Sequence, residues 1–191
     1  MDMLEQLHNR VSTPANMLVE PAPDDAQIEE IVRAGLAAPD HAKMRPWKFI
    51  VIRGDARVSL GNLFAQATAK REPDMAAEKL DKQRSKPLRS PLIIAVSATI
   101  TPGHPKTPVI EQILSAGSAL QLMQLAATAM GFGSIWLTGP NASDASIKAA
   151  LGIAEQDELV GFLYLGTAEV TKEVPQRAAV SEHLEYWQGP V

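Results

Sequence analysis

Cysteine is absent from the 191 residues of this chain. A chain without thiols forms no disulfide bond and binds no metal ion or iron–sulfur cluster through thiolate ligands. Catalysis by a thiol nucleophile is excluded for the same reason. A composition without cysteine fits a protein of the reducing cytoplasm, and we expect a cytoplasmic location.

The sequence also lacks the patterns that are typical of proteins that bind nucleic acids or membranes. Its 18 basic and 22 acidic residues are mixed along the chain and give a formal net charge of −4. No basic patch indicates nucleic-acid binding, and no polybasic run indicates a membrane surface. The uncharged stretch from Ile113 to Met130 contains Gln121 and Gln124 and is flanked by Glu111, so a membrane span is not expected.

Motifs for a metal site or a side-chain nucleophile are missing as well. The four histidines share no metal-ligand spacing, and no serine lies in an elbow motif. The pair Gly131-Phe-Gly133 invites comparison with a dinucleotide-binding loop, but it closes a predicted helix and opens a strand. The dinucleotide loop has the reverse order, because it follows a strand and opens a helix. We therefore predict no metal site and no side-chain nucleophile.

What is present is a long apolar segment around which the rest of the chain can be arranged. Residues Val109–Met130 contain no proline, and apolar or small side chains occupy most sides of the predicted helix. A helix that is apolar nearly all round is buried on most sides. Gly131 ends this helix, a short apolar strand follows, and Gly139 closes the strand. The centre of the protein is thus predicted to be a buried helix that runs directly into a buried strand.

Helix and strand patterns alternate along the remaining chain. A hydrophobic content of 46% supports a real core, and the length favours a single domain over residues 1–191. The predicted helices cover residues 2–9, 26–38, 55–68, 75–84, 109–130 and 144–151, and the predicted strands cover 47–52, 91–97, a segment between 131 and 139, and 158–166. The expected helix caps are Asp24 or Asp25, Asp55, and Asn141 or Ser143. This pattern predicts an α+β or α/β sandwich whose sheet is covered on both faces.

Six segments carry a resemblance when they are taken in chain order. They are Asn9–Ser12, Arg33–His41, Arg45–Val51, Ser115–Gly117 on the long helix, Gly131–Trp136 and Val160–Gly166. Their order resembles that of the FMN-dependent nitroreductase family. The Ala-Pro-Asp-His loop that ends at His41, together with the short chain, resembles the small bacterial branch of YdjA-like NAD(P)H nitroreductases. The resemblance covers about residues 1–170.

The resemblance implies a three-layer α/β/α sandwich of the α+β class, with a central mixed or antiparallel sheet. It also implies a homodimer in which the long helix packs against its partner copy and the tail, residues 171–191, lies on the partner chain. Two FMN molecules would lie at the dimer interface, each touched by both chains. The implied reaction is ping-pong: NADH or NADPH reduces FMN by hydride transfer, and a nitro compound, a quinone or a similar small acceptor then takes the electrons.

The resemblance also implies roles for individual residues. Arg10 and Ser12 match the motif that holds the FMN phosphate and ribityl chain, and Val11 between them offers backbone contacts. Ala37 and His41 match positions around the loop that reaches the cofactor from the other chain. Trp136, Leu137 and Thr138 match the stretch that lies along one flavin face in the family. There a backbone N–H can approach N5 and help to stabilise charge as the ring is reduced. The positions along which the nicotinamide or substrate approaches in the family correspond here to Ala126, Ala127, Thr128, Ala129, Met130 and Gly131.

Four departures from the family pattern concern the charge around the phosphate. Val11 stands where a second arginine is common, and Thr13-Pro14-Ala15 stands where another basic residue is common. Ala37 stands where close relatives can carry arginine. The common Asn-x-Gln-Pro-Trp becomes Lys43-Met-Arg45-Pro-Trp47. The phosphate would then draw charge from Lys43, Arg45 or another basic residue.

Two alternatives to an FMN enzyme follow from the same residues. The missing basic residues suggest a protein that binds or stores FMN on the same fold without efficient turnover. A helical interaction module without a cofactor would explain the buried helix and the apolar tail. It would leave unexplained the matching contexts of Arg10, His41 and Trp136.

Overall fold

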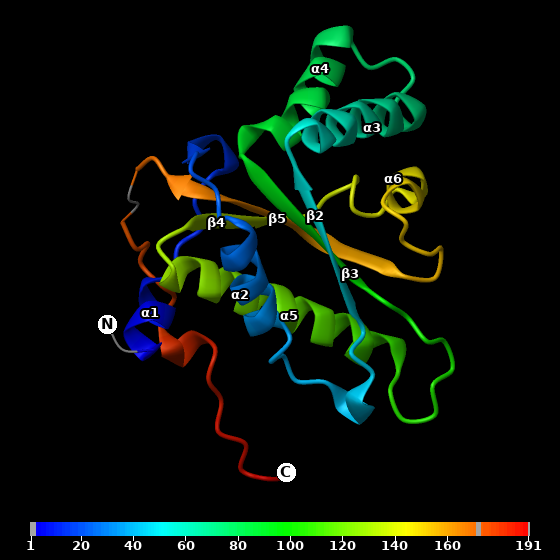
Figure 1. The fold of residues 1–191 in the computed structure, drawn as a ribbon. Coiled ribbons are helices and arrows are strands. Elements are labelled where there is room, and N and C mark those ends of the chain that lie inside the picture. The colour runs from blue at the N-terminus through cyan, green and yellow to red at the C-terminus, as the bar shows by residue number, and fades with distance from the viewer. Residues whose placement is uncertain (1–2, 171–172, 191) are drawn as a thin grey trace.

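The computed structural model describes residues 3–170 and 173–190, which form a sheet between two groups of helices (Figure 1). The prediction of one domain over residues 1–191 includes residues 1, 2, 171, 172 and 191, which lie outside the described residues. The α-helices are α1 (Met3–Asn9), α2 (Asp25–Gly35), α3 (Asp55–Arg71), α4 (Ala77–Ser85), α5 (Val109–Ala129) and α6 (Ala145–Ala150). The 3-10 helices are η1 (Ala15–Met17), η2 (His41–Lys43), η3 (Lys86–Arg89) and η4 (Val180–Glu182). The strands are β1 (Leu18–Val19), β2 (Trp47–Arg53), β3 (Leu92–Ala98), β4 (Gly133–Leu137) and β5 (Glu158–Ala168).

The strands of the described chain pair only in antiparallel fashion, and β5 joins them into one sheet. β3 pairs with β5, with Ala95 opposite Phe162, and β2 pairs with the other side of β3. β4 and the short strand β1 also pair with β5, and Ile135 of β4 lies opposite Tyr164. The prediction of a mixed or antiparallel central sheet is therefore confirmed in its antiparallel form.

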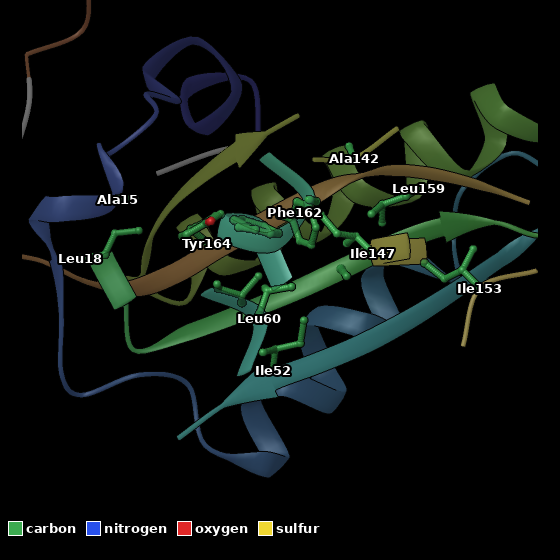
Figure 2. Packing of buried hydrophobic residues seen from close by; sticks show 14 residues of the cluster. Ala15, Leu18, Ile52, Leu60, Ala142, Ile147, Ile153, Leu159, Phe162 and Tyr164 are labelled. Atoms are coloured by element: carbon green, nitrogen blue, oxygen red, sulfur yellow. The ribbon is translucent and has the colours of Figure 1, made fainter. Parts of the chain in front are cut away.

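Side chains that alternate along β3 divide the core between the two faces of the sheet. Ile93 and Ala95 join a cluster with α3 and α6, which Figure 2 shows from close by. Ile94 and Val96 join a second cluster with α2 and α5. Because helices cover both faces, every residue of β3 is buried, which explains its continuous apolar run. The three layers are α2 with α5, the sheet, and α3 with α6.

α5 has a small-residue face toward its own sheet and an apolar stripe that points outward. Ala116, Ala119 and Leu120 are fully buried within the chain. Ile110 and Leu114 lie one turn apart and are 59% and 61% exposed. The small side chains of this helix therefore serve close packing within one chain, and its large aliphatic side chains form the outward stripe. No helix in the described part of the chain is long and apolar enough to span a membrane.

The start of α2 agrees with the predicted cap. The Asp24 carboxylate accepts the backbone N–H of Gln27 at 2.9 Å, and the Gln27 side chain accepts the backbone N–H of Asp24 at 3.0 Å. This reciprocal capping box satisfies two N–H groups that the helix itself cannot pair.

Two other predicted caps are wrong. α3 begins at Asp55, with Gly54 in the cap position, so the Asp55 carboxylate acts only through its charge near the helix N-terminus. α6 is capped by Asp144, whose carboxylate accepts the N–H groups of Ser146 and Ile147. Asn141 and Ser143, the predicted caps, precede it in the loop, and Asn141 is occupied by a contact with α3.

The segment after α1 is folded into the core, whereas the described tail lies on the outside of the molecule. The proline-rich segment after α1 contains η1 and β1, and Leu18 of β1 is buried in the core. The described tail, residues 173–190, runs along the outside of the molecule in the red part of Figure 1. Tyr186 and Trp187 near its end are 79% and 83% exposed.

α3 and α4 cross so closely at Gly61 that no side chain fits there. A Cβ atom at Gly61 would collide with the carbonyl oxygen of Arg84, a backbone atom that cannot rotate away. We expect Gly61→Ala to lower the free energy of unfolding by about 1–3 kcal/mol, the usual cost of overpacking. Chemical denaturation measures the difference, with Ser59→Ala on the exposed face of the same helix as the control. Equal stability of the two variants would show that the crossing tolerates a methyl group.

Candidate functional site

One edge of β4 is open at the residues that the sequence matches to the flavin. β4 pairs with β5 along one edge, and on the other edge the carbonyl of Ser134 accepts the N–H of Thr13 at 2.9 Å. Backbone groups of every second residue point to the same edge of a strand. The N–H and C=O of Trp136 therefore face outward with those of Ser134. No further strand covers this edge within the described residues, so it offers a backbone donor to a flat ligand.

The indole of Trp136 fixes β4 from the side of α5. Its Nε1–H donates to the carbonyl of Val160 at 3.3 Å. A Cβ atom at Gly161 would collide with the indole, and one at Gly117 of α5 would lie 3.8 Å from it. The indole packs with the α2–α5 cluster, whereas the next side chain, Leu137, packs with the α3–α6 cluster. Trp136 thus offers its backbone to the open edge and uses its ring to hold the strand in place.

A cavity of about 350 Å³ lies where β4 ends, on the α3–α6 side of the sheet. Leu137 and Thr138 form part of its wall, and Phe64, Phe162 and Tyr164 line it with aromatic rings. The rings of Phe64 and Phe162 meet edge to face, with centroids 5.4 Å apart; Figure 2 shows Phe162 and Tyr164 side by side on β5. Its volume, and the aromatic rings that it combines with polar groups, suit a small-molecule site.

The charged groups of this cavity are mostly cations. Lys86, Arg89 and Arg71 line it, and Glu72 is the one acidic side chain among the lining residues. Burial, together with the charges of Arg89 and Arg71, holds the pKa of Lys86 below its ordinary value. Burial also raises the pKa of the Tyr164 hydroxyl to about 12, so this group stays protonated at neutral pH. The cavity therefore suits a flat ligand with an electron-rich polar edge.

A second hollow, of about 370 Å³, lies at Arg10, Val11 and Ser12 just after α1. Nη1 of Arg10 donates to Oγ of Ser12 at 3.3 Å, so the two polar side chains lie together. The tail closes this hollow, because Nη2 of Arg177 donates to the carbonyl of Arg10 at 2.6 Å. Glu173 also lines it. Two guanidinium groups and a hydroxyl form a donor set that fits a phosphate.

The cofactor residues matched to the partner chain include His41, which contacts the first turn of α5, whereas α1 lies near the other end of α5 (Figure 1). His41 lies in η2, and its Nδ1 is 2.8 Å from the carboxylate of Glu111 in the first turn of α5. Ala37 is exposed just after α2. Within one chain these two residues are thus separate from the Arg10 hollow, as a role toward a second copy requires.

The loop around His41 has an unusual backbone. Ala42, Lys43 and Arg45 adopt left-handed φ angles of 59°, 55° and 50°, each at a cost of about 1 kcal/mol or more for a residue with a side chain. The Asp40 carboxylate holds the loop by accepting the N–H groups of Met44 at 3.1 Å and Arg45 at 2.7 Å. Lys43 and Arg45 line a hollow of their own. Within one chain, the second cation at the Arg10 hollow is therefore Arg177, and not Lys43 or Arg45.

The end of α5, matched to the substrate approach, is partly core. Ala127 is fully buried, and Ala126 and Met130 pack against the same α2–α5 cluster. Oγ1 of Thr128 donates to the carbonyl of Gln124 at 3.0 Å. Ala129 and Gly131 are exposed, and Ala126, Thr128 and Met130 are half-buried. Of the six residues, Ala129 and Gly131 therefore offer the most open surface in the single chain.

Comparison with known proteins identifies the family of the chain. The model of the nitroreductase family matches residues 16–167, which is more than half of the chain. The chain belongs to the nitroreductase family. Members of the family are oxidoreductases, and this chain is an enzyme of that class. Its relative "Putative NAD(P)H nitroreductase YdjA" from Escherichia coli (strain K12) is 46% identical over 170 residues, which cover 89% of this chain and 90% of the relative.

Solved structures of nitroreductases share the fold. A nitroreductase-like family protein from Bacillus cereus superimposes with a TM-score of 0.84 at 20% identity, covering 99% of this chain and 97% of that one. A nitroreductase with bound FMN from Bacteroides fragilis NCTC 9343 gives a TM-score of 0.71 at 18% identity, covering 98% of this chain and 100% of that one. The predicted nitroreductase-like α+β sandwich is confirmed.

The nitroreductase fold brings together residues that the sequence did not connect. Thr13 links the Arg10 hollow to the start of β4, and the cavity begins where β4 ends. Lys86, Arg89 and Arg177 were not predicted as site residues. Lys86 and Arg89 lie just before the buried strand β3, and that position was the available signal.

Proposed function

We propose that the chain is an FMN-dependent oxidoreductase that uses NADH or NADPH to reduce nitro compounds, quinones or similar acceptors. The observation that carries the proposal is the cationic, aromatic-lined cavity at the end of β4, next to the open backbone edge at Trp136. Bound FMN would accept a hydride from the nicotinamide and pass electrons to the acceptor in a ping-pong reaction. The tasks of the chain are to bind FMN, to orient it and to limit water around it.

The donor groups of the chain fit the parts of FMN. Arg10, Ser12 and Arg177 would hold the phosphate, with the backbone of Val11 beside them. Ser134, next to this hollow, and Thr138, at the cavity, are four positions apart, which is about 13 Å of extended strand. That span suits a ribityl chain between a phosphate at one end and a flavin ring at the other.

The flavin ring would lie along the open edge of β4. The backbone N–H groups of Trp136 and Thr138 would face N5, and the Leu137 side chain would contact one side of the ring. Lys86 and Arg89 would face the polar edge of the ring, where negative charge collects on reduction. Ala129 and Gly131, at the end of α5, have the exposed backbone that an approaching nicotinamide or acceptor needs.

A homodimer is part of the same proposal. The outward stripe at Ile110 and Leu114 gives the second copy an apolar surface. Ala37 and His41 would then reach the FMN of the other copy from the far end of α5. The exposed tail, with Tyr186 and Trp187, would lie on the partner chain. The enzyme would work in the cytoplasm, where NADH and NADPH are available.

Flavin binding and flavin reduction test the proposal separately. The purified protein, reconstituted with excess FMN, is expected to retain one FMN per chain and to elute as a dimer. NADH or NADPH is expected to bleach the flavin absorbance under anaerobic conditions. Absence of both bound flavin and dimer would overturn the proposal. Bound FMN that neither nicotinamide bleaches would favour the binding or storage protein instead.

Lys86→Met is expected to weaken the reaction while leaving the phosphate end of the site unchanged. The variant removes a partly buried cation from the cavity, and a charge-assisted hydrogen bond contributes about 1.5–3 kcal/mol. We expect the midpoint potential of bound FMN to fall and the rate of its reduction by NADH to drop about tenfold or more. Spectroscopic titration and stopped-flow absorbance measure the two effects. Lys79→Met on the exposed surface of α4 is the control, and identical behaviour of both variants would remove Lys86 from the site.

A further inference from the structure

We propose that Arg71 is a positioning residue whose guanidinium ties the end of α3 to the segment 139–144 and so fixes Thr138 beside the cavity. This role rests on the proposed flavin function of the cavity. Arg71 itself need not touch the reacting atoms. It would act through the backbone that follows β4, the stretch proposed to lie along the flavin.

The Arg71 side chain joins two elements that are far apart in the sequence. From the last turn of α3, its Nη2 donates to Oδ1 of Asn141 at 2.8 Å and to Oγ1 of Thr68 at 3.3 Å. Its Nη1 donates to the carboxylate of Asp144. Because a guanidinium is planar and its donors form a rigid fork, it holds both loop residues in one orientation.

The segment that Arg71 grips is a compact turn that starts at Thr138. Gly139 has a left-handed φ of 99°, and its carbonyl accepts the N–H of Ala142 at 2.9 Å. The clamp adds a fixed point at Asn141 and another at Asp144. The direction in which the chain leaves β4 is thus determined at both ends of the turn. The backbone of Thr138 depends on that direction.

Asp144 is held ionised in this arrangement. Burial would raise its pKa, but hydrogen bonds from Ser146, the N–H of Ile147 and Arg71 outweigh burial and lower the pKa overall. The side chains of Arg71 and Asp144 are only 32% and 13% exposed, so water screens the pair weakly. Asp144 also caps α6. A single carboxylate therefore joins α3, the turn and α6.

The contribution of Arg71 is geometric, in contrast to the other cations of the cavity. Its charge is balanced by Asp144. In the described chain, Lys86 and Arg89 form no ion pair with a carboxylate. Loss of Arg71 would release the turn and would also leave the Asp144 carboxylate unpaired near the cavity, so a variant that keeps the positive charge is needed to separate the two effects.

Three variants separate positioning from charge and from helix capping. Arg71→Met removes the clamp, Arg71→Lys keeps a positive charge without the fork, and Asp144→Asn keeps the cap, since asparagine caps helices about as well as aspartate. Each variant is assayed as the FMN-loaded full chain. The measurements are FMN affinity, the flavin absorption spectrum, and the anaerobic rate constant of flavin reduction at saturating FMN and NADH or NADPH.

All three variants are expected to slow flavin reduction and to retain FMN. We expect the rate constant to fall about 10- to 100-fold in Arg71→Met, the range for a small misplacement of reacting groups. Arg71→Lys is expected to recover little of that loss. Asp144→Asn is also expected to lower the rate constant. FMN affinity is expected to change much less, because the phosphate hollow is intact. A shifted flavin spectrum would report the altered contact, which a loss of stability alone would not produce.

Arg53→Met is the matched control, because Arg53 forms an exposed pair with Asp25 on another part of the surface. Wild-type reduction rates and spectra in folded, FMN-loaded Arg71→Met and Asp144→Asn would overturn the positioning role and leave the proposed flavin function standing. A wild-type protein that binds no FMN would overturn both. If Arg71→Met does not fold, Arg71→Lys and Asp144→Asn decide. If all three variants unfold, Arg71 is a structural residue and the positioning role is wrong.

Discussion

Leu114→Asp is expected to separate the two copies of the chain and to release FMN with them. Leu114 is, with Ile110, one of the large aliphatic residues of the outward stripe of α5, with 61% of its surface exposed in the single chain. Packing a second copy against this stripe would bury it. In a twofold dimer the same patch faces itself, so one substitution introduces two carboxylates into one interface. Size-exclusion chromatography with light scattering measures the oligomeric state, and flavin absorbance measures the FMN that remains.

The size of this effect follows from two terms that act in the same direction. Losing a buried leucine costs about 1.5–3 kcal/mol in each copy. Burying an unpaired carboxylate costs several kcal/mol more, and the two carboxylates also repel each other. A total of about 5 kcal/mol or more weakens dimerisation by more than about 1000-fold. FMN is expected to leave because the proposed site takes groups from both chains.

Val58→Asp provides the comparison. Val58 is an exposed aliphatic residue, at 46%, on α3 in the opposite helical layer. Its substitution by aspartate therefore makes a change in hydrophobicity and charge similar to that of Leu114→Asp, but leaves α5 intact. This variant is expected to remain a dimer with full FMN content. A dimeric, FMN-loaded Leu114→Asp would show that the outward stripe of α5 is not the interface.

The elements of the fold were predictable where one local rule decides the structure. β3 is buried on both faces, and its unbroken apolar run in the sequence follows directly from that burial. α5 was predicted over Val109–Met130 and is observed over Val109–Ala129, because glycine after an apolar helix is a strong stop signal. Errors occurred where competing groups were equally plausible. At α6, any of several polar residues could cap the helix, and the contact of Asn141 with Arg71 leaves the cap to Asp144.

The site was less predictable, because the fold assembles it from distant residues. Arg177 and Arg10 are 167 positions apart, and Arg71 and Asp144 are 73 positions apart. No periodicity links such pairs, and a charged residue in a polar stretch gives no sign that it faces a cavity. The resemblance supplied Arg10 and Trp136 through their local motifs. It could not supply Lys86 or Arg177, whose neighbours in the sequence carry no motif.

Arg10→Ala is expected to lower FMN affinity about 10- to 150-fold. Arg10 lies with Ser12 in the hollow proposed for the phosphate, and a hydrogen bond to a charged group contributes about 1.5–3 kcal/mol. Fluorescence titration of the apoprotein with FMN measures the change. Riboflavin, which lacks the phosphate, is expected to bind both proteins alike. Arg33→Ala is the control, because this exposed arginine pairs with Glu30 on the surface of α2.

Arg177→Ala tests whether the tail completes the same site. Nη2 of Arg177 donates to the carbonyl of Arg10, so its loss removes a cation and also frees the backbone that carries Arg10. The two substitutions are therefore expected to be coupled: the double variant should lose less FMN affinity than the sum of the single losses in free energy. Each single variant should also bind FMN with a weaker dependence on salt, since fewer charges face the phosphate. Strict additivity, or an unchanged affinity in Arg177→Ala, would separate the tail from the phosphate and leave Arg10 and Ser12 to hold it alone.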